Sequence, residues 1–286
     1  MFLRQLEYLN ALAREQHFGR AAAACHVSQP ALSTAIRKLE EELGVQLVDR
    51  DGRRAELTAD GRALIRWVDQ TLAGVDGLRS EAAALTAELR GRMRLGVIPT
   101  ALPAVGELVR PLLDRHGEVE VEVVSMSSRE IGEQLASHAI DAGVTYLDNE
   151  PLGAVRATPL YQEEYVFVTP EPAAAEIRWA DLDGVEICLL SGDMQNRRIL
   201  DGLFRDAGAR PRVRLETNSI SALLSFLRAG RPCVVSKAWL DLYGLPAGMS
   251  GVPIGDPAAV HEIGIVVPRA GLVAPPVRAL LESLAD

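Results

Sequence analysis

The chain has 286 residues, a formal net charge of −9, 48% apolar residues and 24% charged residues. Its length exceeds that of one ordinary hydrophobic core, so we expect two domains, and its composition is typical of globular proteins. No apolar run reaches the ~18–20 residues that a membrane span needs. The first turns carry Arg4, Glu7, Arg14 and Glu15, which argues against the apolar core of a signal peptide. We therefore expect a cytoplasmic protein without a membrane partner.

The three cysteines, Cys25, Cys188 and Cys233, lie far apart, and the histidines are scattered. None of them has the spacing of metal ligands or of a disulfide framework. We interpret each cysteine as a small buried apolar residue. We expect no metal site, no cofactor and no catalytic residue.

Three helices are predicted at the start of the chain. Leu3, Leu6 and Leu9 recur at helical spacing, and residues 16–19 end this first helix. An alanine-rich helix follows at about 20–25. The third helix, 28–43, has Ser28 as N-cap, Pro30 in its first turn and Gly44 as C-cap. Its predicted buried stripe consists of Leu32, Ala35, Ile36, Leu39 and Leu43.

A small hairpin is predicted next. Gln46–Val48 and Ala55–Leu57 flank Asp51-Gly52, which is a turn signal. The hairpin carries Arg50, Arg53 and Arg54. Two helices joined by a turn and followed by such a wing are typical of DNA-binding domains.

The outward face of the third helix carries the DNA hypothesis. Gln29, Ser33 and Arg37 are spaced i, i+4, i+8 and share one face. The predicted DNA-binding residues are Ser28, Gln29, Pro30, Ser33, Thr34, Arg37, Lys38, Arg53 and Arg54. Each alone is equally typical of a solvated helix, so the combination carries the prediction. Residues 1–39 have a net charge of +3, whereas Glu40, Glu41 and Glu42 follow directly, so the electrostatic attraction to DNA is local and modest.

A long helix, 59–89, is predicted after a Thr58 cap. Its apolar residues alternate spacings of three and four, which is a heptad seam and implies a partner helix. Gly74 and Gly77 weaken it locally. The predicted dimerisation residues are Leu64, Val68, Leu72, Val75, Leu78 and Leu85.

Strand and helix signals alternate over 93–286. This alternation predicts an α/β domain with largely parallel sheets. Ligands of such sheets lie at the carboxyl ends of strands, near helix N-termini. Candidate effector residues at such positions are Thr100, Ala101, Ser128, Gln195, Asn218 and Ser236. Serine, threonine and asparagine at these positions are also ordinary helix caps.

The segment FGRAAAACHVSQPALSTAIRKLEEELGVQLVDR (18–50) and the following LTADG (57–61) resemble LysR-type transcriptional regulators. The match is continuous over about the first 60 residues, and the remaining pattern agrees in order and length. Val48 departs from it where an aromatic is usual, and Gly19 departs where a Ser or Thr often begins the second helix.

The resemblance implies an N-terminal winged helix-turn-helix (1–58), a linker and dimerisation helix (59–89) and a periplasmic-binding-protein-like effector domain of two α/β lobes (93–286). Lobe I is expected at about 93–160 and 266–286, and lobe II at about 161–265. The implied partners are double-stranded DNA, a second copy of the chain in a homodimer, further copies in a homotetramer, and RNA polymerase. In this family the positions of Thr100 and Ser128 tend to face the effector.

The effector is predicted to be a small molecule, and converging helix N-termini favour an anion such as a small carboxylate. Arg197 or Arg198 is a candidate partner of that carboxylate, although such arginines are more often in surface ion pairs. Three alternatives remain open: an enzyme on the same two-lobed fold, a solute-binding receptor, and an adaptor that dimerises without binding DNA. The sequence lacks GxSxG, HExxH and P-loop motifs, which disfavours the enzyme.

Overall fold

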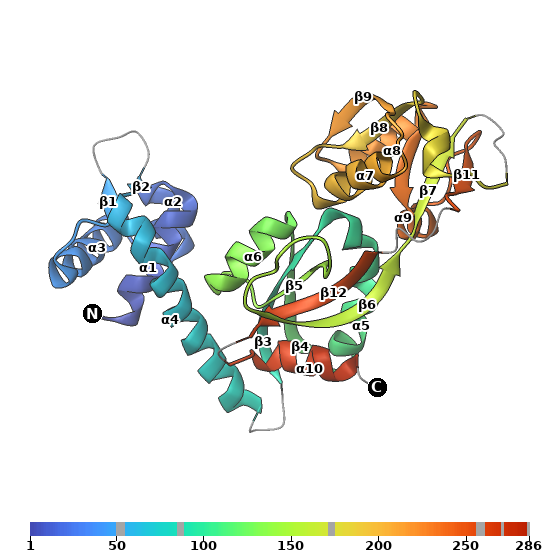
Figure 1. The fold of residues 1–286 in the computed structure, drawn as a ribbon. Coiled ribbons are helices and arrows are strands. Elements are labelled where there is room, and N and C mark those ends of the chain that lie inside the picture. The colour runs from blue at the N-terminus through green and yellow to red at the C-terminus, as the bar shows by residue number, and fades with distance from the viewer. Residues whose placement is uncertain (50–54, 85–88, 171–174, 256–260, 270–271, 285–286) are drawn as a thin grey trace. The chain divides into compact units, whose positions relative to one another are not determined.

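The computed structural model describes residues 1–49, 55–84, 89–170, 175–255, 261–269 and 272–284. The chain divides into two compact units, Met1–Glu88 with Ala136–Ala139, and Leu89–Leu135 with Ile140–Asp286. Figure 1 shows residues 1–84 from blue to teal and the later residues from teal through green to red. No helix among the described residues is long and apolar enough to cross a membrane.

The first unit is a helical cluster with a two-stranded wing. Its elements are α1 (Leu3–Glu15), α2 (Phe18–Ala24), α3 (Gln29–Leu43), β1 (Val48–Asp49), β2 (Glu56–Leu57) and α4 (Ala59–Ala84). Leu9, Leu12, Leu32, Ile36 and Leu39 are fully buried between the helices. Because these leucines and isoleucine recur at helical spacing, their burial stabilises α1 and α3, which would be marginal alone.

Two expectations for this unit were wrong. Helix α2 begins at Phe18, before the expected start, because His17 Nδ1 accepts hydrogen bonds from the N–H groups of Gly19 and Arg20 at 3.0 and 3.4 Å. Leu43, expected in the buried stripe, is 43% exposed in the last turn of α3. The wing pairs Val48 with Leu57 in antiparallel register.

The junction of wing and α4 requires a glycine. Thr58 Oγ1 accepts a hydrogen bond from the N–H of Gly61 at 2.9 Å and caps the helix. A Cβ on Gly61 would lie 2.1 Å from the carbonyl oxygen of Leu47. The start of α4 therefore packs directly on the backbone that enters the wing.

The second unit contains two five-stranded sheets. The first has the order β4 (Glu118–Ser125), β3 (Arg90–Val97), β5 (Ala142–Tyr146), β12 (His261–Pro268) and β6 (Val155–Glu163). Strands β3, β4 and β5 are parallel, whereas β12 is antiparallel to both β5 and β6. Its helices are α5 (Leu102–Arg115), α6 (Ser128–Ala136) and α10 (Pro275–Ser283), and the 3-10 turn η1 (Pro99–Ala101) precedes α5.

The second sheet has the order β11 (Ser250–Pro253), β7 (Tyr165–Thr169), β10 (Cys233–Ser236), β8 (Glu186–Leu190) and β9 (Arg212–Thr217). Its helices are α7 (Gln195–Asp206), α8 (Ile220–Arg228), α9 (Lys237–Tyr243) and the 3-10 turn η2 (Trp179–Leu182). Strand β7 is antiparallel to β10 and β11. Both sheets are therefore mixed, and the expectation of largely parallel sheets was wrong.

The chain passes between the two sheets at the β6–β7 connection. Strand β6 ends at Glu163 and β7 begins at Tyr165. The first sheet includes 161–163 and 261–265, which the sequence analysis placed in the second lobe. Strand β6 itself was not expected from the sequence, and it contains Pro159.

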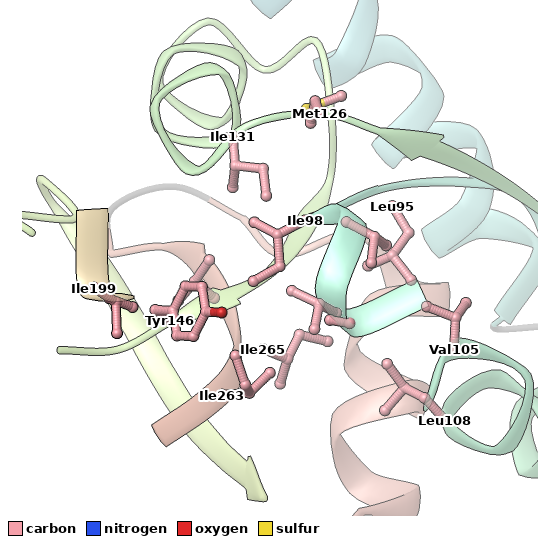
Figure 2. Close-up of a cluster of buried hydrophobic side chains, with 14 of the residues drawn as sticks. Leu95, Ile98, Val105, Leu108, Met126, Ile131, Tyr146, Ile199, Ile263 and Ile265 are labelled. Atoms are coloured by element: carbon pink, nitrogen blue, oxygen red, sulfur yellow. The ribbon is translucent and has the colours of Figure 1, made fainter. Parts of the chain in front are cut away.

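Two apolar clusters form the core of this unit, a large one that includes residues of both sheets and a smaller one around Val168, Leu190 and Leu227. Figure 2 shows side chains from β3, α5, α6 and β12 gathered around Ile98 in the larger cluster. The only oxygen-bearing side chain labelled there is Tyr146, which is 1% exposed. A phenol buried this deeply needs hydrogen-bond partners, and these lead to the candidate site.

Candidate functional site

The outward face of α3 is the first candidate site. Gln29, Pro30, Thr34, Arg37 and Lys38 are exposed, whereas Ser33 is half-buried. Ser28 caps the helix by accepting a hydrogen bond from the N–H of Ala31 at 3.4 Å. The structure thus brings the predicted residues of this helix onto one accessible surface. Arg53 and Arg54 of the wing lie outside the described residues.

The acidic run after this face is partly used by the fold. Glu40 Oε1 accepts hydrogen bonds from the N–H groups of Leu47 and Val48 at 2.9 and 3.1 Å, and it so fixes the first wing strand. Glu42 forms an ion pair with the N-terminal amine of Met1. Arg37 and Lys38 have no ion-pair partner in the described part of the chain. Their charges are therefore available to an anionic partner.

Helix α4 has two different apolar faces. Leu64, Val68 and Leu72 pack into the helical cluster of their own chain, with Val68 only 7% exposed. This differs from the expectation that the whole stripe requires a partner helix. Trp67 and Leu78 instead are 58% and 71% exposed, and their spacing of 11 residues places them on one face. Val75 is half-buried, and Leu85 lies outside the described residues.

A pocket in the second unit is the second candidate site. It lies where β3, β5 and β8 end and where η1, α6 and α7 begin, and its empty space of about 240 Å³ is partly open to solvent. Its lining is Ile98, Pro99, Thr100, Ser127, Ser128, Tyr146, Leu190, Met194, Gln195 and Asn196. The carboxyl ends of strands thus form the site, as the general rule for open sheets states.

Three of the six predicted effector residues, Thr100, Ser128 and Gln195, line this pocket. Ala101 is fully buried in the apolar core behind it, and Asn218 is exposed at the end of β9. Ser236 lines a different cavity. These last three follow strands as expected, but they do not reach the pocket.

Tyr146 and Asn196 were missed by the sequence analysis. Tyr146 ends the strand 142–146, so the rule that identified Thr100 applies to it equally. Its phenol lies 3.3 Å from Thr100 Oγ1 and accepts a hydrogen bond from Asn196 Nδ2 at 3.1 Å. An aromatic residue inside an apolar strand gave no polar signal by itself.

Behind Tyr146 lies a buried carboxyl group. The Tyr146 hydroxyl donates to Glu163 Oε2 at 2.5 Å, and the Tyr165 hydroxyl donates to the same oxygen at 2.7 Å. Burial raises the pKa of Glu163, and these two hydrogen bonds oppose the rise. Burial also raises the pKa of Tyr146 well above its usual value, so this phenol stays protonated.

Side chains from the two sheets meet at the rim of the pocket. Arg198 of α7 forms an ion pair with Glu150 at 2.5 Å, and Gln195 Nε2 donates to the carbonyl of Asp148 at 3.3 Å. The indole N–H of Trp239 donates to the Thr100 carbonyl at 3.1 Å. These contacts connect the two sheets beside the pocket.

The pocket lining carries no basic side chain among the described residues. Arg197 is paired with Asp201 and Glu216, and Arg198 with Glu150. Ser128 Oγ lies 3.5 Å from Glu150 Oε2, the carboxylate that Arg198 neutralises. Both arginines therefore form ordinary ion pairs, which was the alternative to binding a ligand carboxylate.

The cysteines lie away from the pocket. Cys188 and Cys233 face each other on neighbouring strands β8 and β10 and are 2% and 0% exposed. Burial raises the pKa of both thiols, and it raises that of the half-buried Cys25. Thiols in this state are poor nucleophiles.

Two protein-family models match the chain. The model for the bacterial regulatory helix-turn-helix protein of the lysR family matches residues 3–62, and the model for the LysR substrate binding domain matches residues 86–286. Together they cover the exposed helix and the pocket.

Curated relatives match over the whole chain. A hydrogen peroxide-inducible genes activator of Dickeya chrysanthemi is 30% identical over 292 residues, which is 100% of this chain and 94% of the relative. The DNA-binding transcriptional dual regulator OxyR of Escherichia coli K12 is 31% identical over 296 residues, with 100% and 94% covered.

Solved structures agree with the fold. A full-length OxyR variant from Pseudomonas aeruginosa has a TM-score of 0.75 and 26% identity, with 100% of this chain and 94% of that chain covered. CbnR in complex with its target DNA has a TM-score of 0.73 and 23% identity, with 100% and 99% covered, a likeness of fold alone. The curated relatives are regulators of transcription, and the solved structures share the fold of this chain.

Proposed function

This chain belongs to the LysR family of bacterial transcriptional regulators, and from this premise we propose that it binds double-stranded DNA through α3 and is controlled by a small uncharged effector beside Tyr146. The observation that carries the DNA proposal is the exposed face of α3, with Gln29 at its start and the available charges of Arg37 and Lys38 further along. Amide and guanidinium groups at such positions suit base edges and phosphates.

One copy of this domain is a weak electrostatic DNA binder. The chain carries a net charge of −9, and the basic groups are few. Two α3 helices at a fixed spacing would add their contacts on two half-sites. We propose a homodimer formed through the face of α4 that includes Trp67, Thr71, Gly74 and Leu78, all exposed. This replaces Leu64, Val68 and Leu72 as the centre of the proposed seam.

A second self-contact is proposed at the sheet edges. Edge strand β4 carries Glu118, Glu120 and Glu122, whereas edge strand β9 carries Arg212 and Arg214. Val123 and Leu215 on the same strands are 40% and 36% exposed. Opposite charges beside exposed apolar residues favour contact between β4 of one copy and β9 of another. Two different self-contacts would assemble the dimers into a homotetramer.

The effector proposal follows from the groups that line the pocket. Gln195 is 3% exposed, and its Oε1 has no hydrogen-bond partner among the described residues. This acceptor calls for a donor on the effector. Thr100 and Ser128 supply hydroxyl groups, and no lining cation is present to neutralise a carboxylate. A small polar molecule without charge therefore fits better than the anion expected from helix N-termini.

Hydrogen peroxide is one uncharged molecule of this kind, and the relatives are named as activators of peroxide-inducible genes. In this chain no cysteine lines the described pocket, and Cys188 and Cys233 are buried. A response to peroxide in this protein would therefore proceed through hydrogen-bonded binding rather than through thiol oxidation.

Gel-shift titration of the gene's own upstream DNA tests the proposal. We expect binding that weakens steeply between about 50 and 200 mM salt, because phosphate contacts release counterions. We also expect the binding pattern to change with a small polar molecule identified by thermal shift. DNA binding that is absent, or indifferent to salt, would contradict the assignment of α3.

A further inference from the structure

A second cavity opens in the Leu89–Asp286 unit at the crossing between the two sheets. It lies between the end of β6, the start of β7, the end of β10 and the start of α9, and it encloses about 460 Å³ of empty space, part of it open to solvent. We call it the crossover cavity. It shares no lining residue with the pocket beside Tyr146 that we propose for the effector, which we call the effector pocket.

Three buried oxygen atoms of its lining lack partners. Among the residues that the structure describes, no group has hydrogen-bond geometry with Glu163 Oε1, Ser236 Oγ or Tyr161 Oη, although Ser236 lies close enough to Glu163 to lower its pKa. Glu163 is 1% exposed and Ser236 is 4% exposed. All three residues line one cavity, and native proteins rarely leave such atoms without a donor or acceptor, so together they indicate a bound group.

The charges around the crossover cavity indicate the sign of that group. Glu163, Glu164 and Asp241 line it together with a single base, Lys237. Lys237 is engaged by Glu164 at 3.1 Å. Asp241 also acts electrostatically on Lys237, so Glu163 is the acidic group left over, and in its ionised form it favours a cation.

The chemistry of the lining distinguishes an organic cation from a metal ion. No group of three or more His, Cys, Asp or Glu side chains is arranged to hold a metal in the described part of the chain. An alkylammonium group instead carries three N–H donors and no acceptor. One carboxylate oxygen and two hydroxyl oxygens match these three donors in number and polarity.

We propose that the crossover cavity binds the ammonium group of a small organic amine through Glu163 Oε1, Ser236 Oγ and Tyr161 Oη. This goes beyond the proposed function, because it adds a second ligand of different chemistry. The amine would contact one oxygen of the carboxyl group whose other oxygen is held by Tyr146 and Tyr165. Burial raises the pKa of Glu163, and a bound cation would stabilise its ionised form.

Thermal unfolding of the full chain with methylammonium chloride tests the proposal. We expect a saturable rise of the unfolding midpoint, because methylammonium would bind the folded state. Tetramethylammonium chloride at the same ionic strength is the comparison salt. It has the same charge but no N–H donor, so we expect no saturable rise with it.

Two variants locate the site. Ser236→Ala and Tyr161→Phe each remove one acceptor and leave Glu163 in place, and we expect each to raise the methylammonium dissociation constant about tenfold. Ser225→Ala, which changes an exposed serine of α8, is the matched control and should bind like the parent.

Equal effects of the two salts, or unchanged dissociation constants in both variants, would overturn the proposal. A crystal structure grown with methylammonium that shows only a water molecule beside Glu163 would do the same. Because these measurements use no DNA, their failure leaves the DNA-binding proposal standing, and failure of the gel shift leaves them interpretable.

Discussion

Tyr146 donates a buried hydrogen bond of 2.5 Å to Glu163, and this bond connects the lining of the effector pocket with the lining of the crossover cavity. Tyr146 also contacts Thr100 and Asn196, so three polar side chains share one phenol. A change in the charge of Glu163 therefore alters the hydrogen bonding of Tyr146, which lines the effector pocket. Any coupling free energy between the two sites must be reciprocal.

Glu163 should make the folded state less stable as the pH rises. Its pKa is raised in the folded protein, so its contribution is fully present below the unfolded pKa and is lost as the pH rises through the folded pKa. We expect Glu163→Gln to remove this dependence while still accepting from the two tyrosines. Chemical denaturation of both proteins from about pH 4 upwards measures the difference in the free energy of unfolding. Parallel curves would show that Glu163 does not titrate as proposed.

Thr100 should affect the effector response without affecting DNA binding. Thr100→Val removes the hydroxyl that faces the pocket and Tyr146 at nearly constant volume. We expect the effector concentration for half response in a reporter assay to rise about tenfold, which corresponds to one lost hydrogen bond of about 1.4 kcal/mol. Thr100→Ser keeps the hydroxyl and should retain most of the response. An unchanged response in the valine variant would remove Thr100 from the site.

Gln29 and Arg37 should affect DNA binding in different ways. Gln29→Ala is expected to relax base preference at a cost of about 1–3 kcal/mol at the cognate site. Arg37→Ala is expected to weaken binding to all sequences and to lower the salt slope by about one. Gel shifts on cognate and scrambled DNA separate the two effects. Arg110→Ala, which removes an exposed arginine of α5 paired with Glu107, is the control. Variants indistinguishable from this control would mean that another face contacts DNA.

Gly61 and Gly77 of the same helix should respond oppositely to alanine. The Cβ of Gly61→Ala would lie 2.1 Å from the Leu47 carbonyl, so we expect a loss of about 1–3 kcal/mol in unfolding free energy. Gly77 has no atom within 4 Å of an added Cβ, so Gly77→Ala should gain up to about 1 kcal/mol from helix propensity. Urea denaturation measures both. A tolerated Gly61→Ala would mean that the wing and α4 separate easily.

The edge strands should set the final assembly. Glu120→Arg and Arg212→Glu each place like charges at the proposed β4–β9 contact, so each should reduce tetramers to dimers. The double variant restores opposite charges and should regain the tetramer. Analytical ultracentrifugation at several concentrations measures this. Tetramers that survive in both single variants would place the contact elsewhere.

The sequence was most informative where local chemistry determines local structure. Ser28 caps the start of α3 and Gly44 caps its end, and both were predictable because capping depends on neighbouring backbone groups. Thr100, Ser128 and Gln195 were found because they follow strands at helix starts.

The misses arise where tertiary contacts decide. The polar contact of Tyr146 is made by its hydroxyl, which donates a hydrogen bond to Glu163 on another strand, and the local sequence does not show this contact. Strand β6 forms despite Pro159, because the neighbouring strand β12 pairs along its length. Val68 packs within its own chain because α1 covers that part of α4, which a heptad pattern cannot distinguish from a partner helix. His17 as a cap was also missed, because histidine is not a usual residue there.

The ion pair between Arg198 and Glu150 has a consequence for the speed of the response. Together with the Gln195 contact to Asp148 it links the two sheets beside the effector pocket. We expect these contacts to break before an effector enters or leaves. At high effector concentration the observed binding rate should level off at the rate of opening. A bound effector should also remain bound when its concentration falls briefly. Arg198 and Glu150 would thus keep the regulator in its effector-bound state for a short time after the effector concentration falls.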